Sequence, residues 1–132
     1  MQESLDAATQ LMISKQSKSA MLITGKLLER LEKEGKYNAP FGLKVQLIHG
    51  SALVSAEKLG AGLDFLLKLK ETSPAKRQWD VFAESCRVIA SVLEYAEQKE
   101  GSLSNLREAQ ATISRYQLDS IYPNFAVRIS SW

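Results

Sequence analysis

The chain has 132 residues, of which 45% are hydrophobic and 24% charged, a composition that argues against a disordered or fibrous protein and is typical of one globular domain. With 17 basic and 15 acidic residues the net charge is +2, which is too balanced to indicate nucleic acid as a partner. We find no internal repeat, low-complexity tract or long linker, so residues 1–132 are expected to form a single domain.

The single cysteine, Cys86, has no second cysteine with which to form an internal disulfide, and this indicates a reducing compartment. The N-terminal sequence MQESLDAATQ lacks the basic and apolar regions of a secretory signal. No apolar run approaches the roughly 18 residues needed to cross a bilayer. We therefore expect a soluble, cytoplasmic protein without a transmembrane segment. The sequence leaves open whether it is a fragment of a larger protein and whether it forms a homo-oligomer.

The first predicted helical region covers about residues 4–34, where apolar residues recur three and four positions apart. One stripe contains Leu5, Ala8 and Met12, and a second contains Ala20, Ile23, Leu27 and Leu31. The polar stretch SKQSKS (residues 14–19) separates them, and both one long helix and two shorter helices are compatible with it. Gly35 is expected to end this region.

A loop is predicted for residues 36–42 (KYNAPFG), because Asn, Pro and Gly favour non-helical backbone. A second helical region follows over about residues 43–71. It contains Gly60 and Gly62, each of which weakens a helix by roughly 1 kcal/mol relative to alanine. Either a bend near these glycines or the close approach of another backbone would explain them.

Two further helices are predicted after residue 71. Thr72, Ser73 and Pro74 read as the end of one helix and the start of a third, with a hydroxyl at the N-cap and proline at the first helical position. The apolar stripe of the third helix contains Trp79, Phe82, Cys86, Ile89, Leu93 and Ala96. Gly101 is expected to end it, and a fourth helix would start at a cap formed by Ser102, Ser104 or Asn105, with Asn105 and Glu108 spaced as in a capping box.

From Leu118 onward the pattern changes to alternation, and Pro123 pushes the residue before it to extended backbone. The predicted architecture is therefore all-α: an antiparallel bundle of four to five amphipathic helices with an extended C-terminal tail over residues 118–132.

His49, the only histidine, lies in the segment QLIHGSALVSAEKL (residues 46–59), which resembles histidine phosphotransfer domains. Gly50, Ser51 and Ala52 match the small residues that in this family follow the phosphorylated histidine and give a receiver domain room to approach. Gln46 occupies the histidine position and His49 the lysine position. The resemblance implies a degenerate phosphotransfer-like signalling domain that docks a receiver without carrying the phosphoryl group.

The sequence does not predict a catalytic or metal site. His49 and Ser51 are two residues apart on a helix, so their side chains point in different directions and would not form a nucleophilic dyad. A metal site ordinarily needs three or four ligands, and none gather near the histidine, so neither a metal nor a cofactor is expected. The carboxylates of Asp80 and Glu84 are expected to be exposed rather than paired in a sheltered cleft.

Two groups of residues are candidates for partner binding. The aromatic side chains of Tyr122, Phe125 and Trp132 lie in the tail, where aromatic residues either close the bundle or anchor an interface. The cations Lys68, Lys70, Lys76 and Arg77 lie around the predicted turn between the second and third helices, where they either meet phosphates or an acidic partner or are a solvated helix end.

The expected function is that of a non-enzymatic protein–protein interaction module, such as an adaptor, a chaperone or a regulatory subunit, that presents a helix groove or the aromatic tail to another protein. One alternative is the degenerate phosphotransfer-like domain. A second is a binder of acidic lipid or nucleic acid through the local basic patch, whose affinity would fall steeply with salt.

Overall fold

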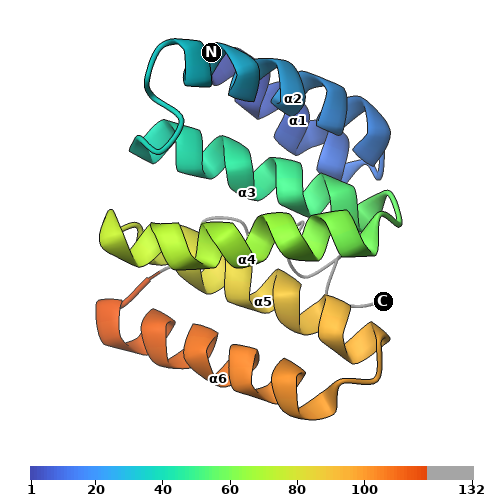
Figure 1. Ribbon diagram of the computed structural model, residues 1–132, viewed down its shortest axis with the longest axis vertical. Helices are drawn as coiled ribbons and strands as arrows, with labels where there is room; N and C mark the ends of the chain where they lie inside the picture. Colours follow the sequence, from blue (N-terminus) through green and yellow to red (C-terminus); the bar gives the residue numbers. More distant parts are fainter. Residues whose placement is uncertain (119–132) are drawn as a thin grey trace.

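Six α-helices make up the part of the chain that the computed structural model describes, residues 1–118 (Figure 1). They are α1 (Gln2–Ile13), α2 (Ser17–Lys33), α3 (Pro40–Ser55), α4 (Leu59–Ala75), α5 (Trp79–Tyr95) and α6 (Lys99–Tyr116). The all-α prediction is confirmed, whereas the count of four to five helices was too low. The predicted extended tail lies outside the described residues, apart from Leu118 at its start.

The helices stack antiparallel in chain order, with α1 and α2 at one end of the long axis and α6 at the other (Figure 1). Each helix packs on the one before it and the one after it, and α3 also contacts α1 and α5. The odd-numbered helices therefore form one layer, and the even-numbered helices form the other.

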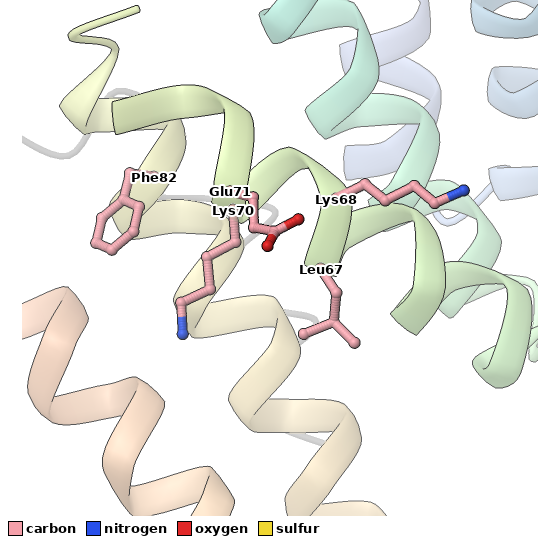
Figure 2. Close-up of a pocket in the computed structure, with 5 residues that line it drawn as sticks. All are labelled: Leu67, Lys68, Lys70, Glu71 and Phe82. Carbon is pink, nitrogen blue, oxygen red and sulfur yellow. The ribbon is translucent and has the colours of Figure 1, made fainter. Parts of the chain in front are cut away.

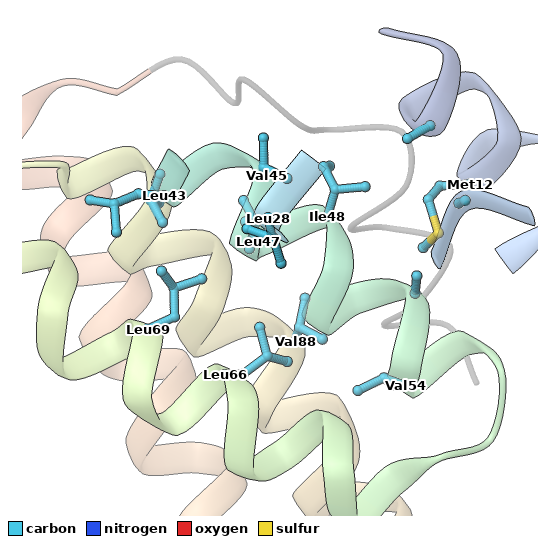
Figure 3. Close-up of a cluster of buried hydrophobic side chains, with 14 of the residues drawn as sticks. Met12, Leu28, Leu43, Val45, Leu47, Ile48, Val54, Leu66, Leu69 and Val88 are labelled. Carbon is cyan, nitrogen blue, oxygen red and sulfur yellow. The ribbon is translucent and has the colours of Figure 1, made fainter. Parts of the chain in front are cut away.

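The hydrophobic core is centred on α3, whose buried side chains come from every side of the helix (Figure 3). They include Leu43, Val45, Leu47, Ile48, Ala52 and Val54. The neighbouring helix α4 buries only one stripe, which contains Leu66 and Leu69. Burying one such aliphatic side chain stabilises the fold by about 1.5–3 kcal/mol. The two-layer stack thus places α3 in the middle and leaves the outer helices half exposed.

The same tight turn ends all six helices. Its first residue is left-handed at Lys15, Gly35, Glu57, Arg77, Glu97 and Gln117, with φ between 50° and 69°. The amide of the next residue donates to the carbonyl five positions earlier, for example from Gln98 to Leu93 over 2.7 Å and from Lys58 to Leu53 over 2.9 Å. This bond satisfies a carbonyl that the helix end would leave unpaired.

These turns recur every 20 residues, with one interval of 22. The structure thus repeats a helix and a turn at a regular interval, although the amino-acid sequences of the repeated segments are not similar. The turn normally favours glycine, but only Gly35 follows that preference among the described residues. The helices also begin without a side-chain N-cap bond, at residues such as Gln16, Lys58 and Gln78. Apart from Gly35, neither of these two common signals marks a helix boundary within residues 1–118.

The structure settles one boundary that the sequence left open and corrects two others. Residues 4–34, for which both one helix and two helices were left open, form two helices joined at residues 14–16. The single helix predicted over 43–71 is broken at residues 56–58, because Glu57 is left-handed. The loop predicted over 36–42 ends earlier, because Pro40 is the first residue of α3.

The predicted restart at Thr72–Pro74 is wrong, because α4 continues through Pro74 to Ala75. The hydroxyls of Thr72 and Ser73 donate back to the carbonyls of Lys68 and Leu69, so both residues belong to the helix interior. Pro74 lies in the last turn, where its missing N–H removes only one helical bond.

The predicted stop at Gly101 and the capping box after it are also wrong. Gly101 lies in the first turn of α6, where a Cβ would meet the Leu93 side chain at 3.1 Å. Asn105 lies inside α6, and its side-chain amide donates to the Gly101 carbonyl at 2.9 Å. Close helix packing, rather than termination, therefore explains this glycine.

The two glycines of α4 differ in their surroundings, which gives a matched pair of stability variants. A Cβ on Gly62 would lie 2.6 Å from Val54 Cγ2 and 3.0 Å from the Val54 backbone nitrogen, whereas a Cβ on Gly60 would meet nothing within 4 Å. We expect Gly62→Ala to destabilise the protein by about 1–3 kcal/mol through overpacking. Gly60→Ala should stabilise it by about 0.5–1 kcal/mol through helix propensity. Urea unfolding of both variants checks this. Equal changes in the free energy of unfolding would contradict the close contact of Gly62 with Val54.

The left-handed turns give a second prediction. Glu97→Gly should stabilise the protein by about 1 kcal/mol, because glycine adopts this backbone conformation without the steric cost of a Cβ. Gly35→Ala should destabilise it by a similar amount. The control is Glu94→Gly, an exposed residue within α5 where glycine costs about 1 kcal/mol. Thermal unfolding checks this. If Glu97→Gly and Glu94→Gly both raise or both lower the stability relative to the wild type, the assignment of the turn is wrong.

Candidate functional site

The predicted partner-binding aromatics, Tyr122, Phe125 and Trp132, lie outside the described residues. The four predicted cations lie within them but do not form one patch. Lys76 and Arg77 are exposed at the α4–α5 turn. Lys68 and Lys70 point in different directions from α4, with only Lys70 directed toward α6 (Figure 2). The basic cluster predicted from the sequence is therefore divided between two locations.

Lys70 bridges two helices that share the even layer. Its Nζ donates to Asn105 Oδ1 at 2.8 Å and to Glu108 Oε2 at 2.6 Å, and both acceptors are on α6. The Cys86 thiol is buried on α5 near this pair of charges. Burial raises the pKa of this thiol to about 12, while Lys70 lowers the pKa and Glu108 raises it. The thiol therefore stays protonated at neutral pH and is a poor nucleophile.

A surface pocket of about 440 Å³ lies beside Lys70 and is lined by Leu67, Lys68, Lys70, Glu71 and Phe82 (Figure 2). We call it the α4–α5 pocket. Leu67 is 43% exposed, and Phe82 adds an aromatic ring from α5. Apolar side chains surrounded by charges of both signs are typical of a protein-binding surface.

His49 belongs to α3, and its side chain lies against α2 and α4 of the even layer. Its Nδ1 is 2.8 Å from Thr24 Oγ1, and its ring centroid is 5.0 Å from that of Phe65. Burial lowers the pKa of the imidazole. Ser51 lies about 200° around the helix from His49, so the two side chains are on opposite sides of α3.

The residues that resemble a phosphotransfer domain are enclosed by neighbouring elements. Gln46, in the histidine position, is buried and donates to the Tyr37 carbonyl at 2.8 Å. A Cβ on Gly50 would lie 2.7 Å from Leu66 of α4. Helix α4 thus covers the surface that a receiver domain would approach in that family.

The structure buries one carboxylate that the sequence analysis placed on the surface. Glu84 is only 3% exposed, and its Oε1 accepts a hydrogen bond from Arg87 at 3.2 Å. Burial raises the pKa of Glu84, the charge and hydrogen bond of Arg87 lower it, and Asp80 raises it. The prediction of an exposed residue was wrong because Glu84 lies opposite the apolar stripe, on a helix that is buried on both sides.

Glu84 belongs to a second group of residues, which we call the α3/α5 face. On α3 and α5, it comprises the buried residues Ile48, Ser51, Glu84, Val88 and Ser91 and the half-buried residues Lys44, Ser55, Asp80 and Arg87. Within residues 1–118, Glu84 Oε2 and Ser51 Oγ are the only buried side-chain oxygens or nitrogens without a hydrogen-bond partner. A buried polar atom left unpaired costs about 1–3 kcal/mol.

Among residues 1–118, no group of three or more His, Cys, Asp or Glu residues could hold a metal ion. In the same range, no helix is long and apolar enough to span a membrane. No family model, curated protein or solved structure matches the chain.

The buried imidazole gives a prediction for pH. Because the folded pKa of His49 is lowered, protonation favours the unfolded chain, so its contribution to stability is full above pH 6.5 and is lost as the pH falls below that value. Each unit of lowering corresponds to about 1.4 kcal/mol. We expect the difference in unfolding free energy between wild type and His49→Gln to change in this direction between pH 7.5 and 5. A difference that does not vary with pH would contradict burial of the ring.

Proposed function

We propose that this chain is a non-enzymatic protein-interaction module that uses the α4–α5 pocket to bind another protein. The observation that supports this most directly is the exposed Leu67 beside Phe82 in a pocket of about 440 Å³. The pocket lies between α4 and α5, where an amphipathic helix of a partner would bury its apolar side.

The charges around the pocket favour a partner that also carries both signs. Lys68 and Glu71 are exposed at its rim, so acidic and basic residues flanking the apolar stripe of the partner would pair with them. Such rim charges contribute more to orientation and association rate than to affinity. Lys70 is held by Asn105 and Glu108, and it therefore acts as a fixed wall of the pocket.

The test is affinity isolation with the full chain as bait, in extract from its native cells. We expect a protein retained by the wild type to be reduced at least about tenfold by Leu67→Asp, because a charge in the apolar centre of an interface is not solvated. The matched control is Leu22→Asp, a leucine that is 67% exposed on α2, and it should retain the partner.

Each other outcome counts against the proposal. Equal loss with both leucine variants would place the binding surface elsewhere, and full retention by Leu67→Asp would exclude the pocket. If the wild-type bait retains no protein that the double variant Leu67→Asp/Phe82→Ala loses, the assigned function is wrong.

A further inference from the structure

Helix α6 packs on the rest of the fold through small and polar residues and leaves its leucines in contact with water. Leu103 is 51% exposed and Leu106 is 40% exposed. Each of the other five helices within residues 1–118 buries at least one leucine or valine. The buried residues of α6 are instead Ser102, Asn105, Ala109 and Thr112.

The positions that the two leucines occupy are covered in the other even helices. Leu106 lies 11 residues before the left-handed residue of its turn, as do Thr24 in α2 and Leu66 in α4. Both of those residues are 0% exposed, and Thr24 Oγ1 is 2.8 Å from the Nδ1 atom of His49 on α3, the helix that follows α2. Helix α6 is the last helix of residues 1–118 and lies at the end of the stack (Figure 1). Its leucines thus occupy positions that a following helix would cover.

The two leucines belong to a row with the spacing of a coiled coil. The row continues from Leu103 and Leu106 through Gln110 to Ile113, which is half-buried, so its members alternate at intervals of three and four residues. This spacing keeps the row on one side of α6, in the arrangement by which two helices pair along their length. A helix lying along α6 would therefore cover the row, which we call the α6 row.

The charges beside the α6 row favour α6 of a second copy as that helix. Glu100 and Arg107 are seven residues apart, so they lie on the same flank of the row, and both are exposed without an ion-pair partner within residues 1–118. A twofold axis that pairs two antiparallel helices brings each flank against the same flank of the copy. Glu100 of one chain then meets Arg107 of the other. A parallel pair would bring this flank against the opposite one, where Ser102 and Ala109 carry no charge.

The same axis also aligns the leucines of the two copies. If the axis passes between residues 104 and 105, Leu103 lies opposite Leu106 of the second copy. Glu100 then lies about 3 Å along the helix axis from the level of Arg107 of the second copy, because two residues separate these levels. The two long side chains can span this offset. One register therefore covers the leucines of both copies and pairs the charges on their flanks.

We propose that this chain forms a twofold-symmetric homodimer in which α6 packs antiparallel against α6 of a second copy. Leu103 and Leu106 form the apolar centre, and the Glu100–Arg107 pairs lie at the rim, where charges determine orientation more than affinity. The α6 row is separate from the α4–α5 pocket, whose wall residue Lys70 contacts the other side of α6 through Asn105 and Glu108. The dimer and the proposed function therefore hold or fail independently.

Sedimentation velocity of the full chain over a concentration series tests this proposal. We expect the wild type to dimerise and Leu103→Asp to weaken dimerisation at least about tenfold, because the interface would bury its charge. The matched control is Leu22→Asp, a leucine that is 67% exposed on α2, and it should dimerise like the wild type. A wild type that stays monomeric up to about 1 mM, the dissociation constant of a very weak complex, would overturn the proposal. The row would then be covered by another protein or by another segment of the chain.

A charge exchange distinguishes the antiparallel α6 contact from any other self-association. Glu100→Arg alone and Arg107→Glu alone set like charges opposite one another, so each should weaken dimerisation at least about threefold. The double variant Glu100→Arg/Arg107→Glu should restore it. Both positions are exposed, and circular dichroism checks that all three variants keep the helical fold. Single variants that dimerise like the wild type, or a double variant as weak as the single ones, would overturn the antiparallel arrangement.

Discussion

The hydrogen bond that closes each left-handed turn determines the rest of this fold. It connects the amide after the left-handed residue to the carbonyl five positions earlier, and within residues 1–118 three residues join successive helices, except for six between α2 and α3. Because the turn is so short, each helix must lie antiparallel against the preceding one. Repetition every 20 residues, with one interval of 22, then gives α2 to α6 lengths of 16–18 residues, while α1 has 12, and produces two layers. The turn forms even with Lys, Glu, Arg or Gln at the left-handed position. Packing of the helices therefore outweighs the conformational free energy of about 1–2 kcal/mol that each of these residues loses in the left-handed backbone.

The two layers determine which polar groups become buried. Helix α5 packs against α3, α4 and α6, so a side chain opposite its apolar stripe is still removed from water. Glu84 is the clearest example, because α5 has the strong apolar stripe of a surface helix and nevertheless buries this carboxylate. Arg87 neutralises part of the cost through one oxygen. A buried pair of this kind contributes little net stability.

The same reasoning separates what the sequence could and could not predict. The three- and four-residue spacing of apolar residues from Trp79 to Leu93 correctly predicted a helix, because this spacing places them on one side of a helix. The turn at Glu57 left no such signal, since neither glycine nor a capping hydroxyl marks it. The α4–α5 pocket was also beyond prediction, because Leu67 and Phe82 belong to different helices and meet only through tertiary packing. Of the predicted cations, Lys68 and Lys70 line that pocket, although the reason given for them was charge alone.

Helix α5 contributes to both the α4–α5 pocket and the α3/α5 face, and this has a mechanical consequence. Phe82 lies at the α4–α5 pocket, and Glu84, two residues later, lies about 200° around the helix on the α3/α5 face. A rigid helix transmits a small rotation or shift from one side to the other, since its backbone bonds hold the two side chains in a fixed relation. The Glu84 carboxylate and the Phe82 ring therefore keep a fixed relation, although Arg87 holds the first inside the fold and the second borders the α4–α5 pocket.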